Sequence, residues 1–295
     1  MDKDLAVDSQ RMEETQLAGV FTKEQMMGMD PLFLRMHLRE RVHHTVEHQL
    51  YSAIYGDRKL GPVFGNIARE ILDVWEARGL PRDLPDIKWI YTLMDLAGRV
   101  KKGEKVEVPG GYLPTPLSET EMNAWEKLLF GRRSYRHWDS RPVPSWMVEK
   151  ILEAGLWAGS GCNLEIWRFI VMEDPAVLKK FANTEFEVEK VKIVVCMDVR
   201  GYRDVQYPPP EKNKLLDIGA ALQNMALMAH ALGLGGCWST FTPEQIEGIH
   251  KHFDLPDHVE VVTYLSLGWA AEKVMPPARM SYKDAILAWA GKKTE

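Results

Sequence analysis

The chain has 295 residues, which is enough for one large domain or for a core domain with a smaller one. Hydrophobic residues make up 45% of it and charged residues 27%, the balance of an ordinary globular protein. Its 37 Lys and Arg residues and 42 Asp and Glu residues give a formal net charge of −5. This acidic balance argues against proteins that bind nucleic acid or anionic lipid through unspecific charge attraction, so we expect neither partner.

Cysteine use and hydropathy point to the inside of the cell. Cys162, Cys196 and Cys237 are widely spaced and form no CxxC pair, so we expect reduced thiols and no structural zinc. The longest apolar stretches, such as 226–234, are too short to span a bilayer, and the first residues lack the apolar core of a signal peptide. We therefore expect a cytoplasmic protein without a membrane segment.

The first third of the chain has the pattern of helices. Apolar residues recur at helical spacing from about Lys23 to Tyr55, from about Val63 to Arg78 and from Ile87 to Val100, with clusters of Gly and Pro between them. No strand-like alternation comes before residue 104. The stretch 101–116, charged and then rich in Pro and Gly, has the composition of a linker. We predict a helical extension with its linker over residues 1–115.

Beyond the linker, helices and short strands are mixed. Ser118 and Glu121 form the pattern of a capping box. The run at 214–232 predicts a long central helix that is apolar all round and therefore buried. The separate helical and strand blocks favour an α+β domain over residues 116–295. In chain order, we predict helices at 118–130, 143–157 and 214–232 and strands at 167–172, 192–197 and 259–267.

Four motifs in this second part could carry chemistry. The first is Gly131-Arg-Arg-Ser-Tyr-Arg-His-Trp138, where three guanidinium groups lie within five residues. Because arginine forks fit the oxygens of a phosphate group, this segment is either an anion site or a solvated basic turn. The residues alone leave both interpretations open.

The other three motifs are two glycine-containing loops and a tail. The loop Ala158-Gly-Ser-Gly-Cys-Asn-Leu-Glu-Ile-Trp167 lets backbone amides approach a planar ligand, or is an ordinary turn from a helix into a strand. The loop Leu232-Gly-Leu-Gly-Gly-Cys-Trp238 either brings a backbone N–H to a ligand or caps the central helix. The segment from Gly268 to Arg279 is a proline-containing tail that ends on a cation.

Together and in this order, the four motifs resemble the nitroreductase family of flavoproteins. That family has an Arg-Arg-Ser-x-Arg opening and an Ala-Pro-Ser-x-x-Asn-x-Gln-Pro-Trp loop. Its long Asp-x-Gly-x-Ala-x-Gln-Asn helix ends in Gly-Leu-Gly, and a Gly-x-Pro-x-x-x-Pro-x-x-Arg tail closes the pattern. The corresponding segments here are 132–136, 158–167, 217–224, 233–236 and 268–279, and the resemblance covers roughly residues 121–289.

The resemblance implies a fold, a cofactor and a reaction. The fold would be an intertwined α+β homodimer with FMN at the interface and, in this chain, an added N-terminal helical extension. A hydride would pass from NAD(P)H through flavin N5 to a small electron-poor acceptor by a ping-pong mechanism. The acceptor would be a nitroaromatic, a quinone or an activated alkene.

The resemblance also implies which residues bind the cofactor. Arg132, Arg133, Ser134 and Arg136 would hold the FMN phosphate and the flavin edge, and Arg279 would close on the phosphate. The first glycine-containing loop would reach the flavin across the dimer interface, and the loop after the central helix would lie near N5. The candidates in these two loops are Gly159, Ser160, Gly161, Asn163, Leu234, Gly235 and Gly236.

Two positions depart from the family pattern. Glu165 and Ile166 stand where the family has Gln and Pro, and a Glu there is similar to the deiodinase-like branch. Reductive dehalogenation and flavin-consuming chemistry are therefore alternative reactions within the same family. Glu165, Tyr135 and His137 are candidates for substrate contact or proton delivery, although the flavin itself performs the redox step.

The front helices raise two alternatives from other classes. His44-Thr-Val-Glu-His48 fits the H-x-x-E-H pattern of zinc peptidases, and Glu40 with His43 adds an E-x-x-H pair. The sequence identifies no further ligand on another element, so we expect a solvated or interface helix face and no metal. The helices could also block the pocket of a non-catalytic flavin-binding protein. From their amphipathic pattern we expect instead a lid or an element that embraces a second copy.

Overall fold

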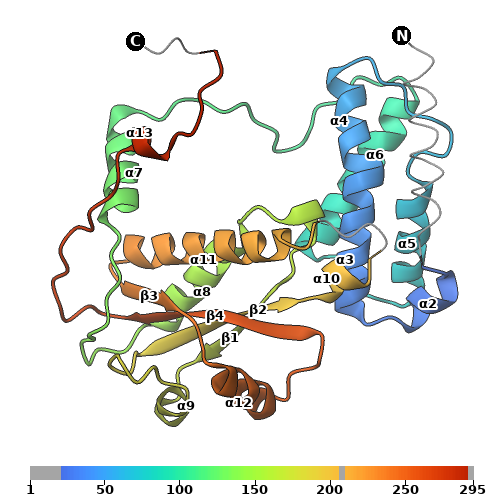
Figure 1. The fold of residues 1–295 in the computed structure, drawn as a ribbon. Coiled ribbons are helices and arrows are strands. Elements are labelled where there is room, and N and C mark those ends of the chain that lie inside the picture. Colours follow the sequence, from blue (N-terminus) through green and yellow to red (C-terminus); the bar gives the residue numbers. More distant parts are fainter. Residues whose placement is uncertain (1–20, 206–209, 292–295) are drawn as a thin grey trace.

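The chain builds a group of helices first and a sheet with its own helices afterwards (Figure 1). The computed structural model describes residues 21–205 and 210–291. Residues 1–20 of the predicted extension lie outside the described residues. None of the helices within the described ranges combines the length and the hydropathy that crossing a bilayer requires.

The first group, here called the N-terminal helices, encloses a hydrophobic cluster of its own that includes Leu38, Trp75 and Ile90. The prediction of helices in this region is confirmed. The run from Lys23 is broken, however, because Asp30 caps a new helix and Pro31 occupies its first position. The elements are α2 (Lys23–Gly28), α3 (Pro31–Val42), the π-helical turn η1 (His43–Glu47), α4 (His48–Tyr55), α5 (Asn66–Ala77) and α6 (Pro85–Lys101).

Four antiparallel strands form one sheet in the order β1-β2-β4-β3. The strands are β1 (Trp167–Met172), β2 (Val191–Asp198), β3 (Gly235–Ser239) and β4 (Val259–Gly268). Every residue of β2 is buried, because helices cover both faces of the sheet. The helices α8 (Ser145–Leu156) and α11 (Asn213–Ala231) pack on one face, and α9 (Pro175–Lys180) and α12 (Pro243–Phe253) on the other. The predicted α+β class is confirmed.

The long helix α11 lies across the sheet (Figure 1). Its inner face, with Ile218, Leu222 and Met225, is buried against α8 and the strands. The prediction that this helix is buried on all sides is wrong for the single chain, because Leu215 and Leu216 are 55% and 64% exposed. One face of α11 is therefore apolar and open.

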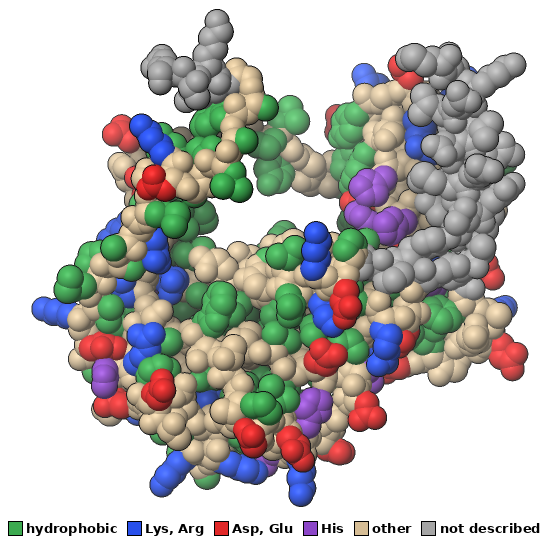
Figure 2. All heavy atoms as spheres, in the orientation of Figure 1, with side chains coloured by type: hydrophobic (Ala, Val, Ile, Leu, Met, Phe, Trp, Pro, Cys, Tyr) green, Lys and Arg blue, Asp and Glu red, His purple; other side chains and the backbone are tan. Residues whose placement is uncertain are grey.

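The linker at 102–118 and the C-terminal arm at 269–291 lie on the outside of the molecule. The helix α7 (Glu119–Gly131), which follows the linker, buries none of its residues. Figure 2 shows a wide opening framed by the linker, α7, α11 and the N-terminal helices. The shorter elements are the 3-10 turn η2 (Gly161–Asn163), α10 (Arg200–Arg203) and α13 (Tyr282–Ala285). The large apolar side chains exposed on these outer segments include Tyr112, Leu113, Trp125, Phe130, Met275, Leu287 and Trp289.

Candidate functional site

The arginine-rich segment lies along the edge strand β3. Ser134 forms an isolated parallel β-bridge with Gly236, and the backbone N–H of Tyr135 donates to the Gly236 carbonyl oxygen over 3.2 Å. Gly235 suits this close contact, because a Cβ at its position would lie 3.0 Å from the Cβ of Tyr135. The structure thus brings together two of the predicted cofactor motifs that are far apart in the sequence.

The predicted phosphate ligands carry unneutralised positive charge. Within residues 21–205 and 210–291, no carboxylate lies at ion-pair distance from Arg132, Arg136 or Arg279. Burial, together with the charges of Arg132 and Arg133, lowers the pKa of the nearby His230. An anion with several oxygen atoms, such as a phosphate group, would be stabilised by the guanidinium groups of Arg132 and Arg136, which both lie near Cys237.

The end of this segment is tied to other loops. The carboxylate of Glu272 accepts hydrogen bonds from the backbone N–H groups of Arg136 and His137, over 2.6 and 3.2 Å. These bonds anchor the C-terminal arm. The His137 ring has its Nδ1 3.2 Å from a carboxylate oxygen of Glu187, and both side chains are 56% exposed. The structure therefore places the candidate His137 in an exposed contact with Glu187.

The first glycine-containing loop lies at the other end of α11. Asp217 holds it, since its carboxylate accepts from the Gly161 N–H over 3.0 Å and from the hydroxyls of Ser160 and Tyr202 over 3.3 and 3.1 Å. The Ser160 oxygen in turn accepts from the Glu165 N–H over 2.8 Å. Burial raises the pKa of Asp217 in spite of these hydrogen bonds. Asp217 is not among the predicted site residues, although it determines the shape of the loop.

Backbone strain is concentrated in the same loop. Cys162, Asn163 and Glu165 have φ angles of 53°, 55° and 50°, in the left-handed region that disfavours residues with a side chain. Among the described non-glycine residues, only Asp254 shares this conformation. Such residues cost roughly 1–3 kcal/mol each and persist where the surrounding structure holds them. The hydrogen bonds around the loop therefore hold it in a conformation that costs free energy.

Arg39 of α3, which the sequence reasoning missed, binds this loop to the N-terminal helices. Its guanidinium donates to the carbonyl oxygens of Asn163 and Leu164, over 3.2 and 2.7 Å. Its Nη1 also lies 2.8 Å from Asp86 Oδ2, and the residue is only 4% exposed. Asp86 is bound by Arg35 as well. Although burial opposes it, these two arginines lower the pKa of Asp86 and keep it ionised.

A pocket of about 610 Å³ opens between this loop and the N-terminal helices. The candidate Glu165 lines it, with one carboxylate oxygen 3.9 Å from the Arg39 Nε. Trp157 lies at its rim and is 83% exposed. Aromatic rings combined with charged groups suit a flat, polar small molecule. The lining residues are Arg35, His43, Glu47, Pro85, Asp86, Trp89, Leu156, Trp157, Ser160, Asn163 and Glu165.

The two groups of predicted cofactor residues do not meet within one chain. The arginine-rich segment and Gly236 lie where α11 ends, whereas Ser160 and Gly161 contact the part of α11 near its start. Asp217, which holds the loop, and Ala231, the last residue of α11, are separated by a helical rise of about 21 Å. Within a single chain, the two groups of predicted cofactor residues are therefore well separated along α11.

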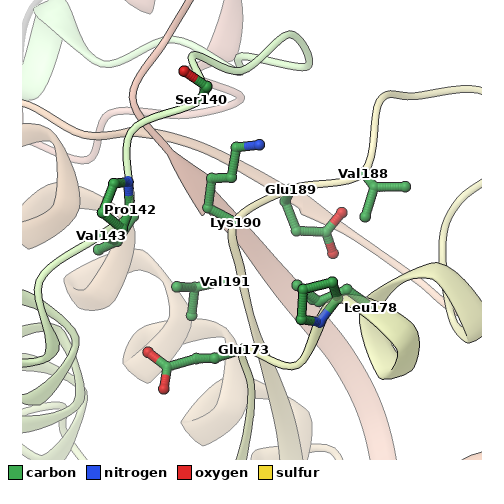
Figure 3. A pocket seen from close by; sticks show the side chains of 10 residues that line it. Ser140, Pro142, Val143, Glu173, Leu178, Val188, Glu189, Lys190 and Val191 are labelled. Atoms are coloured by element: carbon green, nitrogen blue, oxygen red, sulfur yellow. The ribbon is translucent and has the colours of Figure 1, made fainter.

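A second pocket, of about 460 Å³, lies near the start of β2 (Figure 3). Figure 3 shows Lys190 and Glu173 pointing in different directions from its walls. Its buried carboxylate, Glu189, lies 3.0 Å from the ammonium group of Lys192 and is thereby neutralised. None of the predicted site residues lines this pocket.

The histidine motif of the front helices adopts an unexpected arrangement. His44 faces Glu40, with 3.6 Å between its Nε2 and a carboxylate oxygen, whereas Glu47 and His48 lie with His43. In the part of the chain that the structure describes, no group of three or more His, Cys, Asp or Glu side chains is suited to hold a metal ion. The geometry thus gives the zinc-enzyme alternative no support.

Comparisons with known proteins agree with this picture. Residues 129–215 and 189–269 match the family model described as the nitroreductase family. A protein of Methanothermobacter thermautotrophicus, provisionally named an NADH dehydrogenase/NAD(P)H nitroreductase, is 32% identical over 153 residues, which are 48% of this chain and 74% of that protein. Iodotyrosine deiodinase 1 of Rattus norvegicus is 32% identical over 93 residues, 31% of this chain and 33% of that protein.

Among solved structures, NfrA1 of B. megaterium has a similar fold, with a TM-score of 0.52 and 20% sequence identity. The similarity covers 58% of this chain and 76% of that one. At this identity it supports the fold alone. The family match and both relatives cover roughly half of the chain or less, and the matched family segments begin after the N-terminal helices.

Proposed function

The chain belongs to the nitroreductase family, and on that premise we propose that it is an FMN-dependent NAD(P)H oxidoreductase acting on electron-poor small molecules. The observation that carries the proposal is the set of arginines without acidic partners beside the glycine-rich start of β3. When bound, FMN takes up a hydride from one substrate and gives it to another. The protein's task is to hold the cofactor, orient both substrates and exclude water.

The residues present fit FMN. Arg132 and Arg136 would bind the phosphate through charge-assisted hydrogen bonds, with Arg133 and Ser134 beside them and Arg279 closing from the C-terminal arm. Leu234, Gly235 and Gly236 would bring backbone to the flavin ring. Preorganised positive charge and backbone donors stabilise the negative charge that a flavin gains on reduction.

A homodimer would complete the site. Gly159, Ser160, Gly161 and Asn163 would reach the cofactor of the second copy, because the two groups lie at opposite ends of α11. The open face of α11 and the exposed apolar residues of α7 and the C-terminal arm support this assembly. A second copy would pack on the side of the opening in Figure 2 that α7 and α11 form.

The acceptor would be a nitroaromatic, a quinone or an activated alkene. NAD(P)H and the acceptor would use the same space in turn, which is a ping-pong mechanism. The pocket beside Glu165 supports a small flat acceptor, since tryptophan rings and charged groups share its wall. A screen of acceptors with NADH and NADPH tests the proposal. We expect one NAD(P)H to be consumed for each two-electron reduction, and no acceptor-dependent consumption would contradict it.

Reductive dehalogenation is the second candidate reaction. Glu165 at the family's Gln position favours it, as does the similarity to iodotyrosine deiodinase 1, of which the chain spans only about a third. In that reaction a carbon–halogen bond is replaced by a carbon–hydrogen bond and halide is released. Including an iodophenol and a bromophenol in the same screen separates the two candidates, because only dehalogenation releases halide.

A further inference from the structure

The π-helical turn η1 aligns three titratable side chains. In a π-helix, residues five apart lie above one another, and here the rings of His43 and His48 have centroids 4.4 Å apart. Their Nε2 atoms are 3.1 Å apart. The Nδ1 of His43 lies 2.8 Å from a carboxylate oxygen of Glu47. The result is a continuous hydrogen-bonded line from His48 through His43 to Glu47.

This line connects solvent with the pocket. His48 is exposed on the surface, whereas His43 and Glu47 line the pocket and keep only 24% and 23% of their side chains exposed. Figure 2 shows histidine side chains on the wall of the N-terminal helices that faces the opening. Both nitrogens of the His43 ring are engaged, so a proton received at Nε2 can leave from Nδ1.

Glu47 differs from the other carboxylates of the pocket. Asp86 is held ionised by Arg35 and Arg39, and Glu165 lies 3.9 Å from Arg39. The partner of Glu47 is a histidine, which can exchange a proton with it. Glu47 therefore faces a side chain that can itself pass on a proton. Other charged or titratable groups around the line include His44, Arg41, Glu40, Tyr51 and Tyr55.

We propose that His48, His43 and Glu47 form a relay that delivers a proton from solvent to the acceptor in this pocket. The inference rests on the proposed function, in which an acceptor takes up a hydride. Reduction of a quinone, for example, consumes one hydride from NAD(P)H and one proton and yields a hydroquinone and NAD(P)⁺. The Glu47 carboxyl group gives its proton to the acceptor. His43 reprotonates Glu47 from Nδ1 and receives a proton at Nε2 from His48, which is reprotonated by solvent.

The relay would be needed because the proposed dimer restricts the entry of water into the pocket. Trp157 at the rim of the pocket would be covered by the second copy in the proposed dimer, which restricts direct entry of water. A side-chain path through η1 keeps protons available after the pocket closes. The N-terminal helices, which lie outside the matched family segments, would thus supply a catalytic residue, Glu47, and two residues that act through it.

The test measures the reoxidation of reduced enzyme by stopped flow with two electron acceptors. 1,4-Benzoquinone needs a proton for its reduction to hydroquinone, whereas ferricyanide takes electrons alone. We expect Glu47→Gln to slow the reaction with benzoquinone at least about tenfold, since a positioned proton donor contributes roughly 10²–10⁴-fold. The rate with ferricyanide should fall far less than the rate with benzoquinone, because ferricyanide takes up no proton.

His48→Ala gives the second variant, because His48 is exposed and its loss should not disturb folding. It should slow the benzoquinone reaction, and added imidazole should restore the rate. The matched control is His252→Ala, an exposed histidine on α12, which should change nothing. Equal slowing with both acceptors, an unchanged benzoquinone rate or the absence of imidazole rescue would overturn the relay.

Another readout requires no turnover. The ring-proton NMR signals of His43 in the full chain should move in His48→Ala, because the two rings contact one another through their Nε2 atoms. Unchanged His43 signals in that variant would overturn the relay. If the unmodified protein is not reduced by NAD(P)H at all, the proposed function fails instead, and this result is distinct from a failure of the relay.

Discussion

Arg132 and Arg136 carry the cofactor assignment at the scale of single residues. Replacing both with Ala removes two guanidinium groups that have no acidic partner among the described residues, so the folded chain should lose little. We expect the double variant to keep its circular dichroism spectrum and to bind FMN at least about 100-fold more weakly, since charged hydrogen bonds contribute roughly 1.5–3 kcal/mol each. A fluorescence titration with FMN measures this.

Arg141→Ala is the control for that variant, because Arg141 already pairs with Asp139 and lies over the ring of Trp269. Its FMN affinity should be unchanged. Normal FMN affinity in the double variant would remove the phosphate-site assignment.

His37 predicts how stability depends on pH. The side chain is fully buried, and neither ring nitrogen has a hydrogen-bond partner among the described residues. Burial, and then the charge of Arg41, lowers the pKa of His37 from 6.5 to about 3. Below pH 6.5, His37 is therefore protonated in the unfolded chain but stays neutral in the folded chain. The free energy of unfolding decreases as the pH falls through this range. The contribution amounts to about 2 kcal/mol between pH 7.5 and pH 5.

His37→Leu should remove that part of the pH dependence. We measure the free energy of unfolding in urea at pH 7.5 and at pH 5. The decrease between the two pH values should be about 2 kcal/mol smaller in the variant than in the unmodified protein. His252→Leu, at an exposed site, should leave the difference unchanged. An equal fall in the His37 variant and the unmodified protein would show that His37 does not control this range.

Single residues also show where sequence reasoning stops. The arginine-rich segment and Gly235 could be proposed only through the resemblance of several motifs in order, because the residues alone left an anion site and a basic turn both open. The positive φ angles of Cys162, Asn163 and Glu165 could not be predicted, because the contacts around the loop come from Asp217 and Arg39, which are distant in the sequence. Arg39 itself is one charged residue in a charged stretch of α3, and its burial follows only from the packing of that helix on the loop.

At the scale of elements, Arg39 connects α3 with the first glycine-containing loop. Arg39→Gln removes the donors to two loop carbonyls, while Asp86 keeps Arg35 as its partner. We expect a loss of about 2 kcal/mol in the free energy of unfolding, because buried acceptors lose their hydrogen bonds. Amide hydrogen exchange should also become faster within residues 160–166.

Arg35→Gln is the matched control, because Arg35 binds the same Asp86 but makes no hydrogen bond to the loop. It should leave exchange in the loop unchanged. Equal exchange rates in the Arg39 variant and the unmodified protein would mean that the N-terminal helices do not hold the loop.

Most long elements could be predicted because their periodicity is strong. The bounds of β1 and β4 and of α6, α7 and α11 differ from the predicted ones by no more than two residues. The edge strand β3 was missed, since Gly235-Gly-Cys has no alternation and forms a strand only by pairing with β4. The π-helical turn at His43–Glu47 was missed as well, because its spacing differs from an α-helix by a fraction of a residue per turn.

At the scale of the whole molecule, the open face of α11 predicts the assembly. Leu216 is 64% exposed there. Leu216→Glu would place a charge in the proposed interface, so we expect a mass near 33.8 kDa by light scattering, where the unmodified protein shows about twice that. The variant should also lose FMN, because each site needs both copies.

Val188→Glu is the control, in the loop before β2, where Val188 is 38% exposed. It should remain dimeric and keep its flavin. A Leu216 variant that is still dimeric with full flavin content would exclude this face from the interface.

The apolar pattern of α11 illustrates the limit of sequence reasoning at this scale. A helix that is apolar all round is buried either in its own chain or against a second copy, and the pattern is the same in both cases. Leu215 and Leu216 are exposed in the single chain, so a second copy would have to bury them. The position of the N-terminal helices beside the first glycine-containing loop could not be predicted from the sequence either. It depends on buried contacts of Arg39 with Asp86 and with carbonyl oxygens of the loop.

The central claim is that this protein binds FMN and accepts a hydride from NAD(P)H. The visible absorption spectrum of the purified protein with FMN, followed without oxygen while NADH or NADPH is added, tests it most directly. We predict a flavin spectrum that bleaches on addition of one equivalent of at least one of the two nucleotides, NADH or NADPH. A protein that takes up no FMN, or a bound flavin that neither nucleotide bleaches, would contradict the account.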